Sequence, residues 1–366
     1  MKKNTDNIKV VFCAGGTGGH IYPAIATADR LKRTNRLNDI VFFVSGRDVE
    51  KEIFSRKSFT LKEISSAASN RIFSSGALSA FVSIVRGFFS SFFELLKDRP
   101  HVIVSMGGYS SIPPVLAGYM LGIPVILHEQ NALPGKANRF LSRFAKKIAL
   151  SFERSVSYFP KNKVRVTGNP VREEVLTAEA GNTPKKEVCI LVMGGSQGSS
   201  ALNDSVMQLL SLLSGKKSHI ARIVHITGLK DHSRFSAESL KDRADIDYVP
   251  LPYSDRIWEL LASSDLVVSR AGATAIAEIT ARALPSILIP YPYAAERHQD
   301  VNARVLEEAG AARVLDQDKL SGESLLDIIN SLLENREKME RMSVMSGRLA
   351  KPHAARELLG LIYETI

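Results

Sequence analysis

The sequence predicts an α/β protein of two domains, each built on a parallel β-sheet that helices cover. The chain has 366 residues, more than one ordinary hydrophobic core accommodates. Short apolar runs typical of buried parallel strands alternate with stretches of good helix formers. A glycine-rich turn follows an apolar run at Gly15, and another follows one at Gly194, about half the chain length further on. This repetition indicates two βα-repeating halves, each opening with a glycine turn.

The first half contains apolar runs that predict strands, and the first of them leads into a glycine turn. The predicted strands cover residues 9–14, 40–44, 102–105, 124–127 and 164–167. The turn is not a dinucleotide fingerprint, because Ile21 stands where that motif needs its third glycine, and no P-loop lysine follows. It still lets a phosphate approach the backbone. His20 closes the turn and is a candidate proton acceptor, with a structural role as the alternative.

The second half restarts after the polar stretch 181–186. Strands are predicted at 188–193, 223–227, 248–251, 265–268 and 286–289, and the first is followed by a glycine turn and a helix at 201–213. The run 269–278 predicts a strand end, a tight turn and a helix start, where Gly272 gives a ligand room and free amides favour an anion. Glu278 lies about one turn into this predicted helix, and its carboxylate can accept hydrogen bonds from two hydroxyl groups, such as those of a ribose. The alternative is a polar turn with a solvated charge.

Other polar residues follow predicted strands or share a helix face. His128, Glu129, Gln130 and Asn131 end the strand at 124–127, where open parallel sheets place ligands. Arg172 is a candidate diphosphate clamp or a solvated linker arginine. Gln299 and Asn302 stand three residues apart on a predicted helix and therefore share a face of it. Two amide side chains on one face suit sugar hydroxyls, which both donate and accept hydrogen bonds. The alternative is a pair of solvated polar residues.

Charge and composition restrict the partners. The net charge is +10, which suits an anionic partner, but no basic run with interleaved aromatic residues indicates nucleic acid binding. Two cysteines, Cys13 and Cys189, are interpreted as core thiols in a reducing compartment. The apolar tract 72–96 is interrupted by Arg86 and is not expected to span a membrane. It holds more large apolar residues than one inward face needs, so about half should join the core and some should rest on an anionic membrane surface.

Six motifs, in order over nearly the whole chain, resemble the MurG family of bacterial N-acetylglucosaminyltransferases of peptidoglycan synthesis. They lie at 15–20, 128–131, 168–172, 194–198, 269–278 and 299–302. The resemblance implies the GT-B fold, with two Rossmann-like domains facing across a cleft. Residues 1–172 plus a returning helix at 350–366 would bind acceptor and membrane, and residues 173–349 would bind UDP-N-acetylglucosamine (UDP-GlcNAc). The enzyme would be peripheral, on the cytoplasmic face of the plasma membrane.

The implied reaction moves N-acetylglucosamine, with inversion, from UDP-GlcNAc to the 4-hydroxyl of the undecaprenyl-linked muramoyl-pentapeptide (lipid I), without a metal or other cofactor. Glu278 would hold the ribose, and Gln299 with Asn302 the sugar hydroxyls. Asn131 would lie near the transferred sugar. His20 is the first candidate base and Glu129 the second. The expected diphosphate contacts are Thr17, Gly18, Gly19, Arg172, Ser196, Ala273, Thr274, Ala275, Ile276 and Ala277.

Three other functions stay open on the residues alone. The first is an epimerase of UDP-amino sugars, which shares the fold but needs no membrane patch. The second is a non-catalytic nucleotide-sugar binding protein, against which the intact polar motifs argue. The third is a nicotinamide oxidoreductase, against which the incomplete fingerprint at Ile21 argues. The contacts to the uracil base, expected near residues 252–255, are not assigned.

Overall fold

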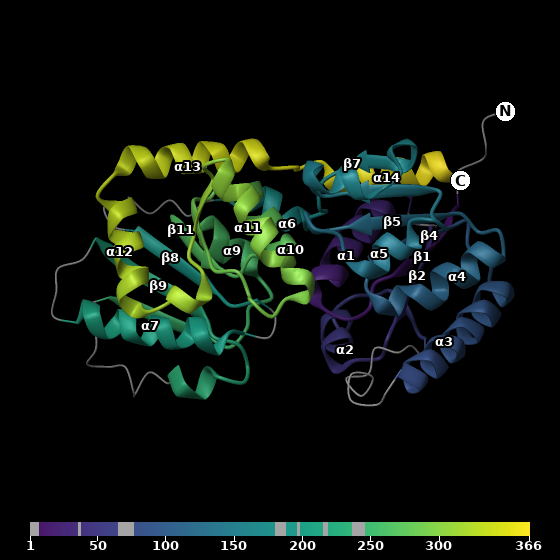
Figure 1. Cartoon of the computed structure of the whole chain (residues 1–366), viewed down its shortest axis with the longest axis horizontal. Helices are drawn as coiled ribbons and strands as arrows, with labels where there is room; N and C mark the ends of the chain where they lie inside the picture. Colours follow the sequence, from purple (N-terminus) through teal and green to yellow (C-terminus); the bar gives the residue numbers. More distant parts are fainter. Residues whose placement is uncertain are drawn as a thin grey trace. The chain divides into compact units, whose positions relative to one another are not determined.

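The computed structural model describes residues 7–35, 38–64, 77–179, 188–195, 198–214, 219–235 and 246–366, without the side chains of 77–80. The chain divides into two compact units (Figure 1). Unit 1 comprises Met1–Arg172 with Lys351–Ile366, and unit 2 comprises Glu173–Ala350. Each unit contains one parallel sheet, so the α/β class with two Rossmann-like domains is confirmed.

Unit 1 holds a seven-stranded parallel sheet in the order β3-β2-β1-β4-β5-β6-β7. The strands are β1 (Lys9–Cys13), β2 (Asp39–Val44), β3 (Thr60–Glu63), β4 (Val102–Ser105), β5 (Val125–Glu129), β6 (Lys147–Leu150) and β7 (Val164–Val166). The helices are α1 (Gly18–Thr34), α2 (Asp48–Phe54), α3 (Ala77–Lys97), α4 (Ile112–Met120), α5 (Lys136–Leu141) and α14 (Ala354–Thr365). Short 3-10 helices are η1 (Tyr109–Ser111), η2 (Glu153–Tyr158) and η3 (Lys161–Lys163).

The central strands of this sheet are buried on both faces, which is why β1 and β4 are almost continuously apolar. Val10 and Phe12 of β1 enter one core with residues of α1, α2 and α14, whereas Val11 and Cys13 enter the other with residues of α3, α4 and α5. Successive side chains of a strand point to opposite faces, so an uninterrupted apolar run supplies both cores. Burial also raises the pKa of the Cys13 thiol, because the thiolate would lose its hydration there.

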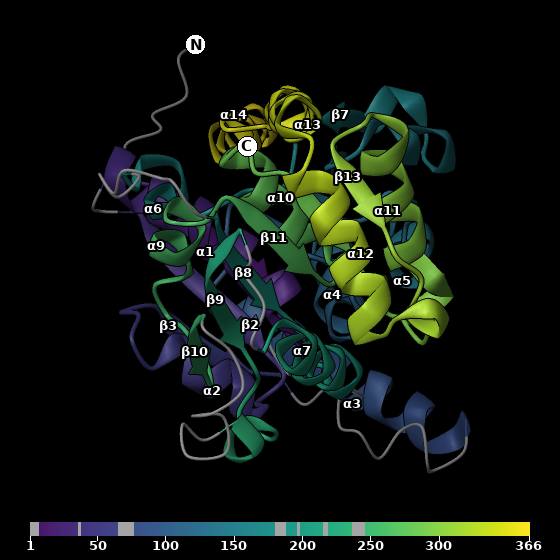
Figure 2. The same ribbon diagram turned by 90° about the vertical axis from the view of Figure 1, so that its left-hand side faces the viewer.

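Unit 2 holds a six-stranded parallel sheet in the order β10-β9-β8-β11-β12-β13. In Figure 2, helices α7 and α12 lie side by side, in agreement with their packing. The strands are β8 (Val188–Met193), β9 (Ile220–Ile226), β10 (Asp247–Leu251), β11 (Leu266–Ser269), β12 (Ser286–Leu288) and β13 (Ala312–Val314). The helices are α6 (Glu173–Thr177), α7 (Ser200–Leu213), α9 (Ile257–Ala262), α10 (Ala273–Ala281), α11 (His298–Glu308), α12 (Gly322–Leu333) and α13 (Arg336–Leu349), with 3-10 helices η4 (His232–Phe235), η5 (Ala295–Arg297) and η6 (Gln317–Lys319).

Every predicted strand is present within one to three residues, but three strands were not predicted. These are β3, β6 and β13, which have only three or four residues each. Strand β5 extends two residues beyond its predicted end at Leu127, because His128 and Glu129 are its last two residues. They pair with Ala149 and Leu150 of the unpredicted β6, which extends the strand.

The tract predicted at 72–96 forms α3, although residues 72–76 lie outside the described part of the chain. Leu95 is buried, and Phe88 and Phe92 pack against the same core. Phe81, Phe89 and Phe93 are 64%, 53% and 63% exposed, so the helix divides its apolar residues between the core and the surface. Within the described ranges, no helix has the length and apolarity needed to cross a bilayer.

Candidate functional site

In unit 1, two glycine turns meet at the carboxyl edge of the sheet and enclose His20. The turns follow the neighbouring strands β1 and β4, and Gly16, Gly107 and Gly108 have φ of +110°, +88° and +81°, which favour glycine. A Cβ on Gly108 would stand 3.4 Å from Cε1 of His20, and one on Gly16 would stand 3.8 Å from Nδ1. The His20 imidazole therefore lies between the turns, where a Cβ at either glycine would be in van der Waals contact with it.

Helix α1 begins within this turn and directs its amino end at the same edge. Thr17 is the N-cap with extended backbone, Gly18 and Gly19 are the first two helical residues, and the amide of His20 donates to Thr17 O at 3.0 Å. The first turn contains no acidic residue. The amino end of a helix carries partial positive charge, so this turn suits an anionic group.

Glu50, which the sequence analysis did not identify, fixes the glycine turn from beneath. It is 1% exposed, and its carboxylate accepts from the amide of Gly16 at 2.6 Å, the amide of Ser45 at 2.9 Å and the amide of Arg47 at 3.1 Å. The turn after β1 is thus bonded to the turn after β2. The only local signal was a glutamate three residues into a helix, which predicts a capping role but not the contact with Gly16.

His128 is buried as a neutral imidazole in a hydrogen-bond chain. Gln130 Nε2 donates to His128 Nδ1 at 3.0 Å and to Met106 O at 2.8 Å, so His128 Nε2 carries the proton and donates to Gly168 O at 3.2 Å. Burial, and to a smaller extent the nearby His20, lowers the pKa of His128 to about 4, although the hydrogen bond to Gly168 O opposes the fall. Both ring nitrogens are occupied, so His128 and Gln130 connect the loops after β4, β5 and β7.

Glu129, the second candidate base, accepts hydrogen bonds from the loop that follows it. It is 2% exposed, and four donors reach its carboxylate: the amide and Nδ2 of Asn131 at 2.9 and 3.1 Å, the amide of Gly135 at 3.2 Å, and Asn138 Nδ2 at 2.8 Å. Desolvation raises its pKa, and these hydrogen bonds oppose the rise. A general base needs access to the substrate proton. Glu129 instead fixes the loop that carries Asn131.

Arg172, the last residue of the first segment of unit 1, lies against α1. Its guanidinium carbon stands 4.5 Å from the ring centroid of Tyr22, which is a cation–π contact. Tyr22 is only two residues beyond His20 in the same helix. The fold therefore holds Arg172 in the neighbourhood of the glycine turn.

In unit 2, the loop after β11 and the start of α10 form the predicted strand, turn and helix. Gly272 is the N-cap with φ −68°, which any residue adopts, so the backbone of this turn does not require glycine. A Cβ there would meet no atom within 4 Å, so the missing side chain opens space above the helix start. Ala273 and Ile276 are buried, and Thr274, Ala275 and Ala277 are half-buried, so this turn can offer mainly backbone groups to a ligand.

Glu278 and the two predicted amides occupy different depths. Glu278 is 6% exposed on α10. Gln299 is half-buried, and its side chain accepts from the amide of Tyr291 at 3.0 Å. Asn302 is fully buried and donates to Ala271 O at 3.2 Å, so the two amide side chains have different partners. Asn302 faces inward and supports the turn before α10. Ser196 lies outside the described residues.

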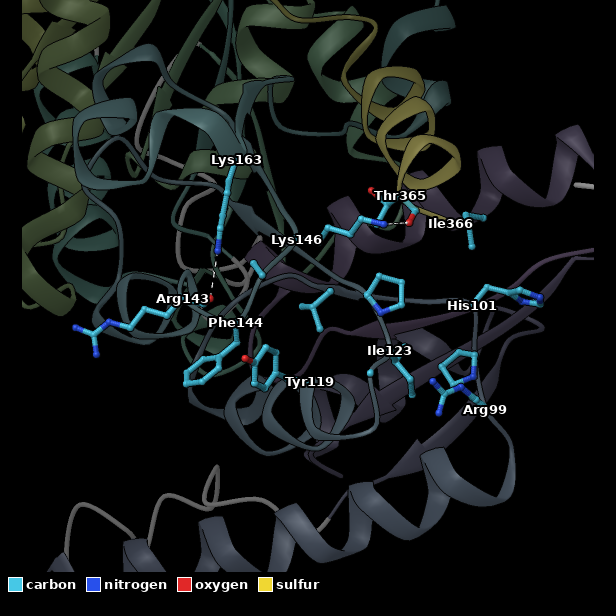
Figure 3. A pocket seen from close by; sticks show the side chains of 15 residues that line it. Arg99, His101, Tyr119, Ile123, Arg143, Phe144, Lys146, Lys163, Thr365 and Ile366 are labelled. Atoms are coloured by element: carbon cyan, nitrogen blue, oxygen red, sulfur yellow. Dashed lines mark hydrogen bonds between the residues drawn. The ribbon is translucent and has the colours of Figure 1, made fainter. Parts of the chain in front are cut away.

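A cavity of about 760 Å³ lies elsewhere in unit 1 and contains none of the candidate site residues (Figure 3). Most of its lining residues directly precede β4, β5 and β6, so it opens at the amino edge of the sheet, opposite the glycine turns. Arg99, Arg143, Lys146 and Lys163 line it, and no Asp or Glu side chain does. Lys146 Nζ donates to Thr365 O at 2.7 Å. The cavity is strongly basic.

Comparison with known proteins places the chain in a family. The family model of the glycosyltransferase family 28 N-terminal domain matches residues 10–150, and that of the C-terminal domain matches residues 189–358. A UDP-N-acetylglucosamine–N-acetylmuramyl-(pentapeptide) pyrophosphoryl-undecaprenol N-acetylglucosamine transferase of Halothermothrix orenii is 38% identical, over 98% of this chain and 99% of that protein.

Solved structures agree with this result. The crystal structure of Acinetobacter baumannii MurG is 27% identical with a TM-score of 0.77, and the match covers 98% of this chain and 99% of that one. A putative UDP-N-acetylglucosamine 2-epimerase from Listeria monocytogenes has a TM-score of 0.71 at 15% identity, over 98% and 96% of the two chains, a likeness of fold alone. The predicted GT-B fold is confirmed, and the chain belongs to the MurG family of family 28 glycosyltransferases.

Proposed function

We propose that this protein is an inverting N-acetylglucosaminyltransferase. It moves N-acetylglucosamine from UDP-GlcNAc to the 4-hydroxyl of the undecaprenyl-diphosphate-linked N-acetylmuramoyl-pentapeptide, and the product is lipid II. The observation that carries this proposal is the 38% identity to a transferase of that name over 98% of this chain and 99% of the relative. The reaction belongs to peptidoglycan synthesis and so to cell-wall biogenesis, cell shape and cell division.

Unit 2 would hold the donor. The start of α10, at Ala273 to Ala277, would face the diphosphate with its backbone, as amino ends of helices do for anions. Glu278 would accept the ribose hydroxyls, and Gln299 would contact the sugar. Asn302 would keep the turn in place through Ala271 O, at 3.2 Å. Ser196 remains a proposed diphosphate contact.

Unit 1 would hold the acceptor and supply the proton acceptor. The acceptor O4 attacks the anomeric carbon, the bond from that carbon to the donor diphosphate breaks, and UDP leaves with the bonding electrons. We assign to His20 the role of accepting the proton from O4, since the polar atoms of Glu129 and His128 are hydrogen-bonded to other partners. Thr17, Gly18 and Gly19 would face the diphosphates, Arg172 would stabilise developing negative charge, and Asn131 would orient the sugar.

The membrane contact would use the exposed side of α3. Phe89, Phe93 and Leu96 are 53%, 63% and 57% exposed there. Helix α3 packs along α4, and α4 carries the exposed Tyr119 and Met120 next to the basic cavity of Figure 3. Apolar side chains with cationic neighbours favour an anionic lipid surface. We therefore propose a peripheral enzyme on the cytoplasmic face of the plasma membrane.

An assay with both substrates tests the proposal. Purified protein is incubated with labelled UDP-GlcNAc and a short-chain lipid-linked muramoyl-pentapeptide, beside Glu278→Ala and His20→Ala. We expect acceptor-dependent transfer by the wild type, weaker donor binding by the first variant, and loss of turnover with retained donor binding by the second. Conversion of the donor sugar without acceptor would contradict the proposal and favour an epimerase activity. That alternative is supported by a likeness of fold alone.

A further inference from the structure

Arg270 is a buried cation at the carboxyl edge of the second sheet. It directly follows β11 and is 6% exposed. Its Nε and Nη2 donate to Ser199 Oγ at 3.1 and 2.5 Å, and Nη2 also donates to Gln317 Oε1 at 2.6 Å. Its Nη1 donates to Ile289 O at 3.2 Å and to Pro290 O at 3.3 Å. A guanidinium has five N–H donors, so every donor of Arg270 is used.

The acceptors of Arg270 are all uncharged. They are a hydroxyl, a side-chain amide and two backbone carbonyls, and no carboxylate within the described ranges pairs with it. Arg304 in the same unit shows the usual arrangement, with Glu307 at 2.6 Å and Asp316 at 2.9 Å. Burial lowers the pKa of Arg270 to about 10, which leaves it charged at neutral pH. Burying a charge without an opposite charge is costly.

The position of this charge suggests what compensates it. Ser199, which Arg270 contacts, is the N-cap of α7 and also accepts from the amide of Leu202 at 3.4 Å. Gly272, two residues after Arg270, is the N-cap of α10. The strands that lead to these elements, β8, β11 and β12, are neighbours in the sheet. The positive ends of two helices and a buried cation thus occur at one edge, a combination that attracts an anion.

We infer that Arg270 is a positioning residue for the donor diphosphate, which its positive charge attracts while its hydrogen bonds fix the start of α7 and tie the loop before α10 to the segment after β12. The inference rests on the proposed function, because it takes the UDP diphosphate as the anion bound at this edge. Arg270 acts through its field and its neighbours, because a ligand finds all five of its N–H groups already engaged.

Gln317→Glu in the full chain tests this inference without removing Arg270. The new carboxylate would lie where Oε1 now stands, 2.6 Å from Nη2, and would neutralise the cation while keeping its hydrogen bond. Neutralising a cation near a bound diphosphate in a partly buried site raises the dissociation constant of the diphosphate by about tenfold or more. We expect UDP binding, measured by calorimetry, to weaken by about that factor. Binding of uridine, measured by ligand-observed NMR, should stay unchanged because uridine carries no phosphate.

Two control variants separate charge from packing. Gln317→Ala removes the hydrogen bond without adding charge, and Asn330→Glu adds the same charge at an exposed position of α12. Both should bind UDP within about threefold of the wild type, while Gln317→Glu keeps or raises the melting temperature. Unchanged UDP binding by Gln317→Glu, or equal losses for UDP and uridine, would overturn the inference. Wild-type protein that binds no UDP would contradict the proposed function itself, and the inference with it.

Discussion

Replacing Glu50 with glutamine should destabilise unit 1 by an amount that follows from its hydrogen bonds. Oε1 accepts from the amide of Gly16 at 2.6 Å and from Ser45 Oγ at 2.5 Å, and Oε2 accepts from the amides of Ser45 and Arg47 at 2.9 and 3.1 Å. An amide nitrogen placed at Oε2 would face two backbone N–H groups that cannot turn away. It will therefore take the Oε1 position, where the Ser45 hydroxyl can rotate to accept.

The remaining loss is then the bond to Gly16, whose buried N–H would face another donor. A lost hydrogen bond to a charged group with an unsatisfied donor costs about 1.5–3 kcal/mol. We expect the free energy of unfolding of unit 1, followed by circular dichroism in denaturant, to fall by about that amount. Hydrogen exchange of the peptide that contains Gly16 should accelerate in parallel.

The matched control is Glu63→Gln. Glu63 lies in the same unit, its side chain is 63% exposed, and it contacts Lys51 at 3.7 Å. An exposed pair of this kind contributes little, so the change should stay within about 0.5 kcal/mol. A Glu50→Gln protein as stable as this control, with unchanged exchange at Gly16, would refute the assignment of Glu50 as the support of the glycine turn.

Three further predictions concern other parts of the chain. Leu361→Ala, at a fully buried position where α14 packs in the first core, should cost about 2–5 kcal/mol in denaturant unfolding; a loss below about 1 kcal/mol would mean that α14 is not docked there. His128 titrates at about 4 when folded and near 6.5 when unfolded, so the unfolded state binds more protons between these values; stability is full above pH 6.5 and should fall by about 3 kcal/mol toward pH 4, and a His128→Gln protein with the wild-type pH slope would contradict this. Phe93→Ser, at a 63% exposed position, should weaken sedimentation with anionic vesicles about tenfold while the melting temperature stays the same, whereas equal vesicle binding would exclude Phe93 from the membrane contact.

The strands were predictable because burial on both faces makes them continuously apolar, as in β1 and β8. The short strands β3 and β13 were not, because Thr60–Glu63 carries two charged residues and Ala312–Val314 has only three residues. These strands depend on pairing with β2 and β12, which no local pattern specifies.

Among the site residues, too, local features were predictable from the sequence and long-range contacts were not. The position of His20 beside a glycine turn was visible in the sequence, since the turn and the helix start are local features. The partners of Glu50 and Arg270 were not, because each reaches loops after neighbouring strands that are distant in sequence. The inward orientation of Asn302 was also hidden, since helical spacing shows which residues share a face but not what that face meets.

The most direct test of the central claim is the structure of the product. The protein is incubated with UDP-GlcNAc and a water-soluble lipid-linked muramoyl-pentapeptide, and the products are analysed by NMR and mass spectrometry. We expect release of one UDP per acceptor consumed and a new β-linked N-acetylglucosamine on the 4-hydroxyl of the muramoyl residue. Release of UDP or epimerisation of the donor sugar in the absence of acceptor, with no disaccharide formed in its presence, would contradict it.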